Sequence, residues 1–185
     1  MRDMIAPLYD CKSVVFMKNI VLIGFMGVGK GSVAREMVKR SRLVSLDTDD
    51  IIESMENRKI KNIFAEESEE YFRELERKVA RWLQKKVEGT LISTGGGFFK
   101  VPNLKKIGTV VLLNAPFEVI YNRILEHPDS GKKLRKRPLF QDIERARALY
   151  EERLPLYLKV ADIVIDVSDK ELVTIAREIL KKVKK

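Results

Sequence analysis

The chain has 185 residues, of which 45% are hydrophobic and 34% charged, as is typical of one domain with a substantial core. Since no apolar run reaches about 18 residues, a membrane-spanning helix is excluded, and a single cysteine, Cys11, excludes an intrachain disulfide and indicates a reducing cytoplasm. Residues 132–137 and 181–185 carry five and four cations, which account for the net charge of +9, and so concentrated a charge disfavours a nucleic-acid-binding face.

The first sixteen residues precede a strand-like run that begins directly after Met17. They lack the long apolar stretch of a secretory signal. We interpret residues 1–16 as a loose extension, or as lying ahead of a natural start at Met17. The domain itself is expected to span residues 17–185.

A glycine-rich segment follows the first predicted strand, residues 19–25, and precedes a helix-like run at 33–40. The segment GFMGVGKGS at 24–32 fits the phosphate-loop pattern G-x-x-x-x-G-K-[ST], except that Gly31 stands in place of Ser or Thr. Its backbone N–H groups and the helix N-terminus suit a polyphosphate, and Lys30 would reach the terminal phosphates. The predicted nucleotide contacts are Gly27, Val28, Gly29, Lys30, Gly31 and Ser32.

The second predicted strand, residues 43–47, ends in the acidic turn Asp-Thr-Asp-Asp. Because ligands gather beyond the carboxyl ends of strands in open parallel sheets, Asp47 and Asp49 are expected to face the phosphate loop. One carboxylate can hold Mg²⁺ directly or through water, and the other can accept a proton from an attacking hydroxyl. The alternative is an acidic turn that only caps a helix. Residues 48–68 insert charged helical turns after this strand.

A long helix is predicted at residues 69–87, where apolar residues recur at helical spacing. Its apolar stripe consists of Phe72, Leu75, Val79, Trp82 or Leu83, and Val87. Arg73 and Glu76 lie three residues apart on this helix, and an arginine is suited to bidentate capture of a carboxylate. An ordinary ion pair is the alternative, and Phe72 taken alone is more typical of the core.

Three further strands are predicted at residues 90–94, 109–113 and 162–167. All five strand-like runs are rich in Val, Ile and Leu and hardly alternate, which predicts a parallel α/β sheet with strands covered on both faces. The third strand leads into Ser-Thr-Gly-Gly-Gly-Phe at 93–98, where the glycines let the backbone approach a ligand closely. A purely structural loop is the alternative.

Residues 126–140 are polar, basic and flanked by helices, which suits a mobile lid, with an ordinary exposed loop as the alternative. Arg137 on such a lid can neutralise charge on a transferring phosphoryl group. His127 is expected to be an exposed residue without a catalytic role. Arg153 is expected near a helix end, where it can bind another anion.

Taken in order, these segments resemble the shikimate kinase family, in the nucleoside-monophosphate-kinase branch of P-loop proteins. The matching series covers nearly everything from Met17 onward: GFMGVGKGS, LDTDDIIE, NIF with YFRELE, STGGGF, RPLF, and ERLPLY followed by VADIVIDV. The resemblance implies a P-loop kinase fold, with a five-stranded parallel sheet flanked by helices, a substrate-binding segment at about 48–76 and a lid at about 125–140. It also implies ATP-dependent phosphorylation of the 3-hydroxyl of shikimate, on the way to chorismate and aromatic amino acids.

The resemblance assigns roles position by position. Lys30, Asp49 and Arg137 match catalytic residues, with Asp49 as the base and Arg137 facing both substrate and γ-phosphate. Asp47 matches the acidic residue associated with Mg²⁺ through water, and Arg123 an arginine that lies against adenine. The matching shikimate contacts are Asp49, Phe72, Arg73, Glu76, Gly95, Gly96, Gly97 and Arg153. We expect a cytoplasmic monomer with ATP and Mg²⁺, and neither nucleic acid nor membrane as a partner.

Gly31 departs from the family pattern, because it offers no side-chain oxygen to Mg²⁺. Three outcomes stay open. Water fills the position, which we rank first; Ser32 is recruited; or the protein binds nucleotide and turns over poorly. The alternatives to an active shikimate kinase are therefore a nucleotide-binding homologue with impaired activity and a related small-molecule kinase, such as one for gluconate.

Overall fold

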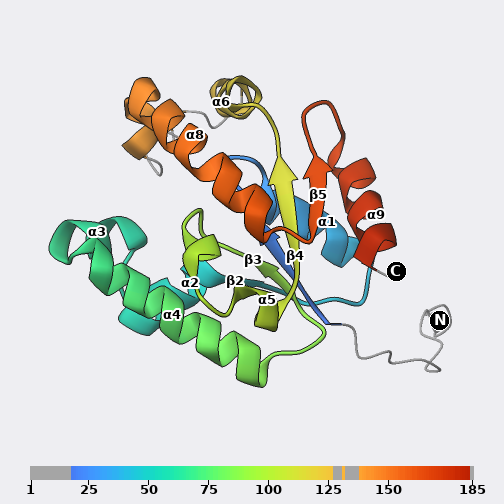
Figure 1. Ribbon diagram of the computed structural model, residues 1–185, viewed down its shortest axis with the longest axis horizontal. Coiled ribbons are helices and arrows are strands. Elements are labelled where there is room, and N and C mark those ends of the chain that lie inside the picture. Colours follow the sequence, from blue (N-terminus) through green and yellow to red (C-terminus); the bar gives the residue numbers. More distant parts are fainter. Residues whose placement is uncertain (1–17, 127–130, 132–137, 184–185) are drawn as a thin grey trace, which may run out of the picture.

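The computed structural model describes residues 18–126, 131 and 138–183, along which strands alternate with helices (Figure 1). In chain order the elements are β1 (Asn19–Ile23), α1 (Lys30–Lys39), β2 (Ser45–Asp47), α2 (Thr48–Glu56), α3 (Ile60–Glu66), α4 (Glu69–Lys86), β3 (Leu91–Ser93), η1 (Phe98–Lys100), α5 (Leu104–Ile107), β4 (Gly108–Asn114), α6 (Phe117–Leu125), η2 (Pro138–Gln141), α8 (Ile143–Val160), β5 (Ile163–Asp166) and α9 (Leu172–Val183). All five predicted strands are present, and the predicted α/β class is confirmed.

The five strands form one sheet in the order β2-β3-β1-β4-β5, and every neighbouring pair is parallel. β1 is therefore the central strand, and all five of its residues are buried. Because every strand points the same way, the loops after β1, β2 and β3 emerge at one edge of the sheet.

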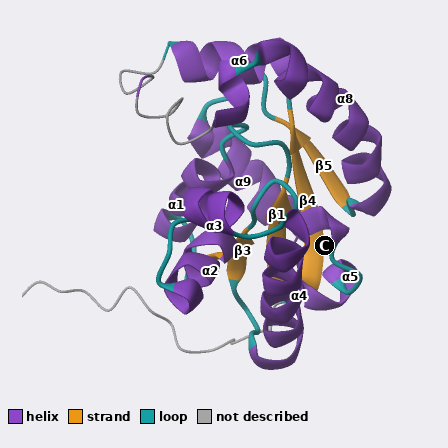
Figure 2. Cartoon of the chain, turned by 90° about the vertical axis from the view of Figure 1, so that its left-hand side faces the viewer, coloured by secondary structure: helices purple, strands orange, loops and turns teal. Residues whose placement is uncertain are grey.

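Helices cover both faces of the sheet, as parallel strands joined by right-handed crossovers require. The α1 and α9 helices lie side by side on one face (Figure 1; Figure 2). The α4, α5 and α8 helices lie on the other face. The α1 helix begins directly after the glycine-rich segment that follows β1, which places its N-terminus at the carboxyl edge of the sheet.

Two local predictions need correction. The expectation that every strand is covered on both faces is wrong for β5, where Val164 is 42% exposed while Ile165 is buried. β5 is an edge strand, so its residues alternate between a covered and an open side. Arg153 does not lie near a helix end, because α8 continues through Pro155 to Val160.

The long predicted helix is confirmed at nearly its expected bounds, as α4. Its apolar stripe passes through Leu83, which is fully buried, while Trp82 is 44% exposed. Ser68 caps the helix, because its hydroxyl accepts a hydrogen bond from the Tyr71 N–H at 3.2 Å. The stripe therefore holds α4 against the sheet and aims the first turns of α4 at the carboxyl edge.

Some predictions fall outside the described residues. These are the extension at 1–16 and most of the lid, with His127 and Arg137. Among the helices that the structure does describe, none combines the length and the apolar character needed to cross a membrane.

Candidate active site

The phosphate loop lies between β1 and α1 and is shaped by glycines. Gly27 and Gly29 have φ angles of 87° and 109°, in the left-handed region that favours glycine. A Cβ at Gly27 would also come within 2.7 Å of Ile124, so the loop runs close against α6. Gly29 directly precedes α1, where the helix N-terminus supplies unpaired N–H groups for an anion.

Lys30 is buried at the first position of α1. Its ammonium donates to the carbonyl oxygens of Gly24, at 2.7 Å, and Phe25, at 3.1 Å. The lysine therefore folds back over its own loop, which holds the charge where phosphate oxygens can replace the two carbonyls.

Of the two residues after Lys30, only Ser32 has a side-chain oxygen that could reach a metal. At Gly31 a Cβ would meet only the Arg35 guanidinium, at 3.5 Å, so the position has room for a side chain but provides no oxygen. The Ser32 hydroxyl accepts a hydrogen bond from Arg35 Nη2 at 3.3 Å. No cluster of three or more His, Cys, Asp or Glu side chains suited to a metal occurs within the described ranges.

Asp47 ends β2, and both of its carboxylate oxygens accept hydrogen bonds. Oδ1 accepts from the Asp49 N–H at 2.9 Å and so caps α2, while Oδ2 accepts from the Ser93 hydroxyl at 2.8 Å. Asp47 and Ser93 are register partners, each the last residue of its strand. The acidic turn thus does cap a helix, and the carboxylate is also oriented from the neighbouring strand. Ser93 was not predicted as a site residue.

Asp49 lies in the first turn of α2 rather than on the strand itself. Burial, together with the charge of Asp47, raises the pKa of Asp49 to about 7, although the charge of Lys30 opposes the shift. Gly95 packs so closely that a Cβ there would collide with the Asp49 carboxylate. The glycine loop after β3, residues 93–98, and the acidic turn at 47–50 are therefore in direct contact, and Asp49 is able to accept a proton near neutral pH.

Arg73 and Glu76 form the predicted pair on α4, with Nη1 and Oε2 at 2.5 Å. Glu76 is only 1% exposed, and burial raises its pKa although Arg73 opposes the shift. Its second oxygen, Oε1, is buried and has no hydrogen-bond partner among the described residues. A Cβ at Gly97 would collide with the Arg73 guanidinium, so this arginine lies directly against the glycine loop.

Arg153 approaches the same loop from α8. Its Nη1 donates to the Gly96 carbonyl at 3.2 Å, while its Nε is buried and has no hydrogen-bond partner in the described part of the chain. The charge of Arg153 also acts on Glu76 and opposes the rise of its pKa. One arginine thus pairs with the buried carboxylate and a second acts on it by its charge, while the second arginine keeps a buried N–H without a partner among the described residues.

The remaining described site residues are Phe72 and Arg123. Phe72 is 4% exposed and packs against the ring of Phe64, with 4.6 Å between centroids. The Arg73 guanidinium lies 5.6 Å from the centre of the Phe72 ring, so Phe72 supports that arginine from the core. Arg123, on α6, donates to the carbonyl oxygens of Val167 and Ser168, which follow β5 at the same edge of the sheet.

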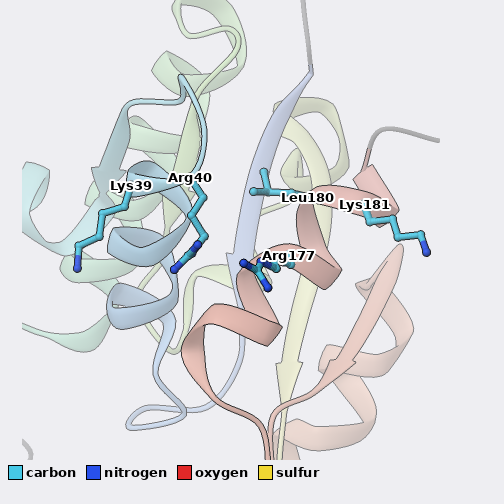
Figure 3. A pocket seen from close by; sticks show the side chains of 5 residues that line it. All are labelled: Lys39, Arg40, Arg177, Leu180 and Lys181. Carbon is cyan, nitrogen blue, oxygen red and sulfur yellow. The ribbon is translucent and has the colours of Figure 1, made fainter. Parts of the chain in front are cut away.

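A hollow of about 600 Å³ lies between α1 and α9, away from the candidate active site (Figure 3). Its lining residues are Lys39, Arg40, Arg177, Leu180 and Lys181. Arg40 and Arg177 point toward one another across it, while Lys39 and Lys181 point outward. None of the predicted site residues lines this hollow, which lies at the end of α1 away from the phosphate loop.

Comparison with known proteins points to one family. The family model for shikimate kinase matches residues 26–184. A shikimate kinase from Helicobacter hepaticus is 39% identical over 164 residues, which cover 89% of this chain and 95% of that protein.

Solved structures give the same result. The chain resembles a shikimate kinase from Acinetobacter baumannii in complex with shikimate, with a TM-score of 0.78 and 31% identity over 91% of this chain and 93% of the other. A gluconokinase from Sinorhizobium meliloti is more distant, with a TM-score of 0.56 and 16% identity over 91% of this chain and 93% of the other, a likeness that concerns the fold alone.

Proposed function

The chain belongs to the shikimate kinase family. On that premise we propose that it transfers the γ-phosphoryl group of ATP to the 3-hydroxyl of shikimate. One observation carries the proposal: Arg73, paired with buried Glu76, and Arg153, bonded to Gly96, both approach the glycine loop at the sheet edge that holds the phosphate loop. Such a site suits a small polyhydroxylated carboxylate next to a nucleotide.

Recognition of the shikimate carboxylate falls to the two arginines. The Nε of Arg153 is a buried donor without a partner among the described residues, so an acceptor on the substrate would offset the free energy that leaving it unpaired costs. Glu76 holds Arg73 in place, and Gly97 leaves room for its guanidinium. A carboxylate bound between the arginines would fix one end of the substrate ring, so that a hydroxyl on the ring reaches Asp49.

Asp49 is the proposed general base. Its raised pKa, about 7, makes it a stronger proton acceptor than an ordinary aspartate, while a large fraction remains ionised at neutral pH. It would take the proton of the 3-hydroxyl as the oxygen attacks the γ-phosphorus, with ADP as the leaving group. Gly95 lets the carboxylate lie against the glycine loop, which limits its movement.

The phosphate loop and Lys30 are the proposed holders of ATP, together with Gly27, Val28, Gly29, Gly31 and Ser32. The left-handed glycines, the α1 N-terminus and a buried ammonium fit a polyphosphate. Arg123 and Arg137 are the further proposed ATP contacts. Phosphoryl transfer depends on alignment and charge neutralisation, which these groups supply.

Mg²⁺ would neutralise charge on the phosphates when it is bound with the nucleotide. Asp47 is the proposed protein ligand, through water, since hydrogen bonds from Asp49 and Ser93 orient its carboxylate. We propose that water takes the place of the missing hydroxyl at Gly31, because the Ser32 hydroxyl is bonded to Arg35.

We further propose that the protein is a cytoplasmic monomer. The single cysteine supports a reducing compartment. Size-exclusion chromatography with light scattering would test the monomer, since a mass of twice 21.4 kDa would contradict it.

A coupled assay for ADP release tests the substrate. Purified protein with ATP and Mg²⁺ is offered shikimate or gluconate, and we expect release that depends on shikimate alone. Equal turnover of gluconate would favour a broader small-molecule kinase. Tight ATP binding without turnover of either compound would favour the impaired homologue.

Arg73 provides a test of the carboxylate site itself. The Arg73→Ala variant should raise the KM for shikimate by about 100-fold and leave the KM for ATP unchanged, because a buried charged hydrogen bond is lost. Arg77→Ala is the matched control, since Arg77 lies on the same helix and, within the described part of the chain, forms ion pairs with Glu70 and Glu74. A change in ATP affinity alone would contradict the assignment of Arg73.

A further inference from the structure

Tyr157 is a fully buried tyrosine on α8, at 2% exposure. Its ring packs against Phe99, with 4.4 Å between centroids, and its hydroxyl donates to the Gly96 carbonyl at 2.6 Å. Burial raises the pKa of Tyr157 to about 12, so the phenol remains a hydrogen-bond donor throughout the physiological range. A buried hydroxyl needs such a partner, and here the partner belongs to the glycine loop.

The Gly96 carbonyl takes two donors from one face of α8. Arg153 lies one helical turn before Tyr157, and its Nη1 donates to the same oxygen at 3.2 Å. A carbonyl oxygen has two lone pairs, so both are used. Because one of its partners is the arginine proposed for shikimate, the position of the loop and the position of Arg153 depend on each other.

The Gly96 carbonyl also affects the next residue of the loop, Gly97, on the side where Arg73 lies. The peptide unit is planar and trans, so fixing the Gly96 C=O fixes the direction of the Gly97 N–H. Gly97 is the residue that Arg73 lies against, without room for a Cβ. The Gly96–Gly97 peptide unit therefore lies between the two arginines, and the Tyr157 hydroxyl holds it by a hydrogen bond to its carbonyl.

We propose that Tyr157 is a positioning residue for the shikimate carboxylate, acting through the Gly96 carbonyl on the glycine loop, Arg153 and Arg73. This inference rests on the proposed function. Without the hydroxyl, the carbonyl keeps only the longer bond from Arg153, and the peptide can tilt. Arg153 then loses its fixed position, whereas hydrogen bonds from Lys30 hold the phosphate loop independently of Tyr157.

Tyr157→Phe tests the proposal, because it removes one hydroxyl and keeps the ring against Phe99. Tyr150→Phe is the matched control: Tyr150 lies on the same helix, and its hydroxyl also donates to a carbonyl, that of Ala115, at 3.0 Å. Both variants lose one such bond, and Tyr157→Phe should lose somewhat more stability because Tyr150 is only partly buried. Only Tyr157→Phe should raise the KM for shikimate, by about tenfold, with the KM for ATP unchanged.

A second measurement distinguishes positioning from general loosening. Calorimetry gives the affinities for shikimate and for its neutral carboxamide, whose ratio reports recognition of the carboxylate charge. The ratio should fall by about tenfold in Tyr157→Phe and stay at the wild-type value in Tyr150→Phe. An unchanged ratio in Tyr157→Phe, or an equal fall in both variants, would overturn the proposal.

Wild-type protein provides a test that does not depend on the variant folding. If Tyr157 holds the loop, its buried hydroxyl proton, which is bonded to the Gly96 carbonyl, should exchange slowly with solvent before shikimate is added. Fast exchange that slows only with shikimate would contradict the inference. If wild-type protein neither binds nor phosphorylates shikimate, the proposed function fails first, and the two failures are thereby distinguished.

Discussion

Asp49 illustrates how burial turns an ordinary aspartate into a base. Because its pKa is raised to about 7, the carboxylate form that accepts a proton is populated above this pH and lost below it. We therefore expect log(kcat/KM) for shikimate to rise with unit slope below about pH 7 and to level off above it. Rates measured from pH 5 to 9 check this, and a flat profile down to pH 5 would contradict it.

The raised pKa of Asp49 favours activity at higher pH, but it makes the folded state less stable as the pH rises. The folded protein holds a proton on Asp49 up to about pH 7, whereas the ordinary pKa is 3.8, so the folded state binds more protons between these values. Stability from this group is therefore present at low pH and is lost as the pH rises through that range. Asp49→Asn should raise the melting temperature at pH 8 while lowering turnover by about 100-fold or more. A lower melting temperature, or turnover that survives, would contradict this account of Asp49.

Gly31 is the residue where this chain departs from the phosphate-loop pattern G-x-x-x-x-G-K-[ST], and the departure can be reversed. A serine Cβ fits, since its nearest contact would be the Arg35 guanidinium at 3.5 Å. Gly31→Ser should add about 0.5 kcal/mol of stability by helix propensity. It should also lower the Mg²⁺ concentration for half-maximal activity, because a hydroxyl joins the metal shell.

Ser32→Ala is the control for Gly31→Ser. If Ser32 supplied the missing ligand, its removal would raise the Mg²⁺ requirement. We expect no change, as its hydroxyl is bonded to Arg35. Thermal unfolding and Mg²⁺ titrations of both variants decide between water and Ser32 at this position.

At the scale of elements, periodic patterns predicted most of the fold. The buried run of β1 and the stripe of α4 are strong local signals, and both elements lie where they were expected. The edge position of β5 and the continuation of α8 through Pro155 were not predictable, because each depends on which neighbour covers the element. Because a proline removes a backbone hydrogen bond inside a helix, the local pattern at Pro155 favours a helix end rather than continuation.

The α2–α4 segment is held together by an ionic cluster around Arg58. Arg58 pairs with Glu56 at 2.7 Å, Glu66 at 3.0 Å and Glu67 at 3.1 Å, and Tyr71 donates to Glu56 at 2.7 Å. These contacts join the end of α2, the end of α3 and the start of α4. They therefore fix the first turns of α4, where Arg73 begins the proposed shikimate site.

Arg58→Ala should raise the KM for shikimate by no more than about fivefold, because exposed ion pairs contribute little individually. Urea unfolding should show a small loss of stability in parallel. Added salt should reproduce part of the effect in the wild type by screening the cluster. Arg77→Ala, which breaks ion pairs within α4 alone, should change neither KM. Equal effects of the two substitutions would show that the cluster has no special link to the site.

At the scale of the whole molecule, the parallel topology explains why motifs far apart in sequence meet. The loops after β1, β2 and β3 all emerge at one edge, so the phosphate loop, the acidic turn and the glycine loop were predictable as neighbours. Ser93 and Tyr157 were missed, since their roles arise from strand register and from the docking of α8. The spacing of Tyr157 from Arg153, one helical turn, was the only signal in the sequence.

Direct identification of the product tests the central claim. Wild-type protein is incubated with shikimate, ATP and Mg²⁺, and the product is examined by mass spectrometry and by phosphorus and proton NMR. We predict stoichiometric ADP and a single phosphate ester at the 3-hydroxyl, with Asp49→Asn forming almost none. Phosphate on another hydroxyl, or ADP formed without any ester, would contradict the site as it is assigned.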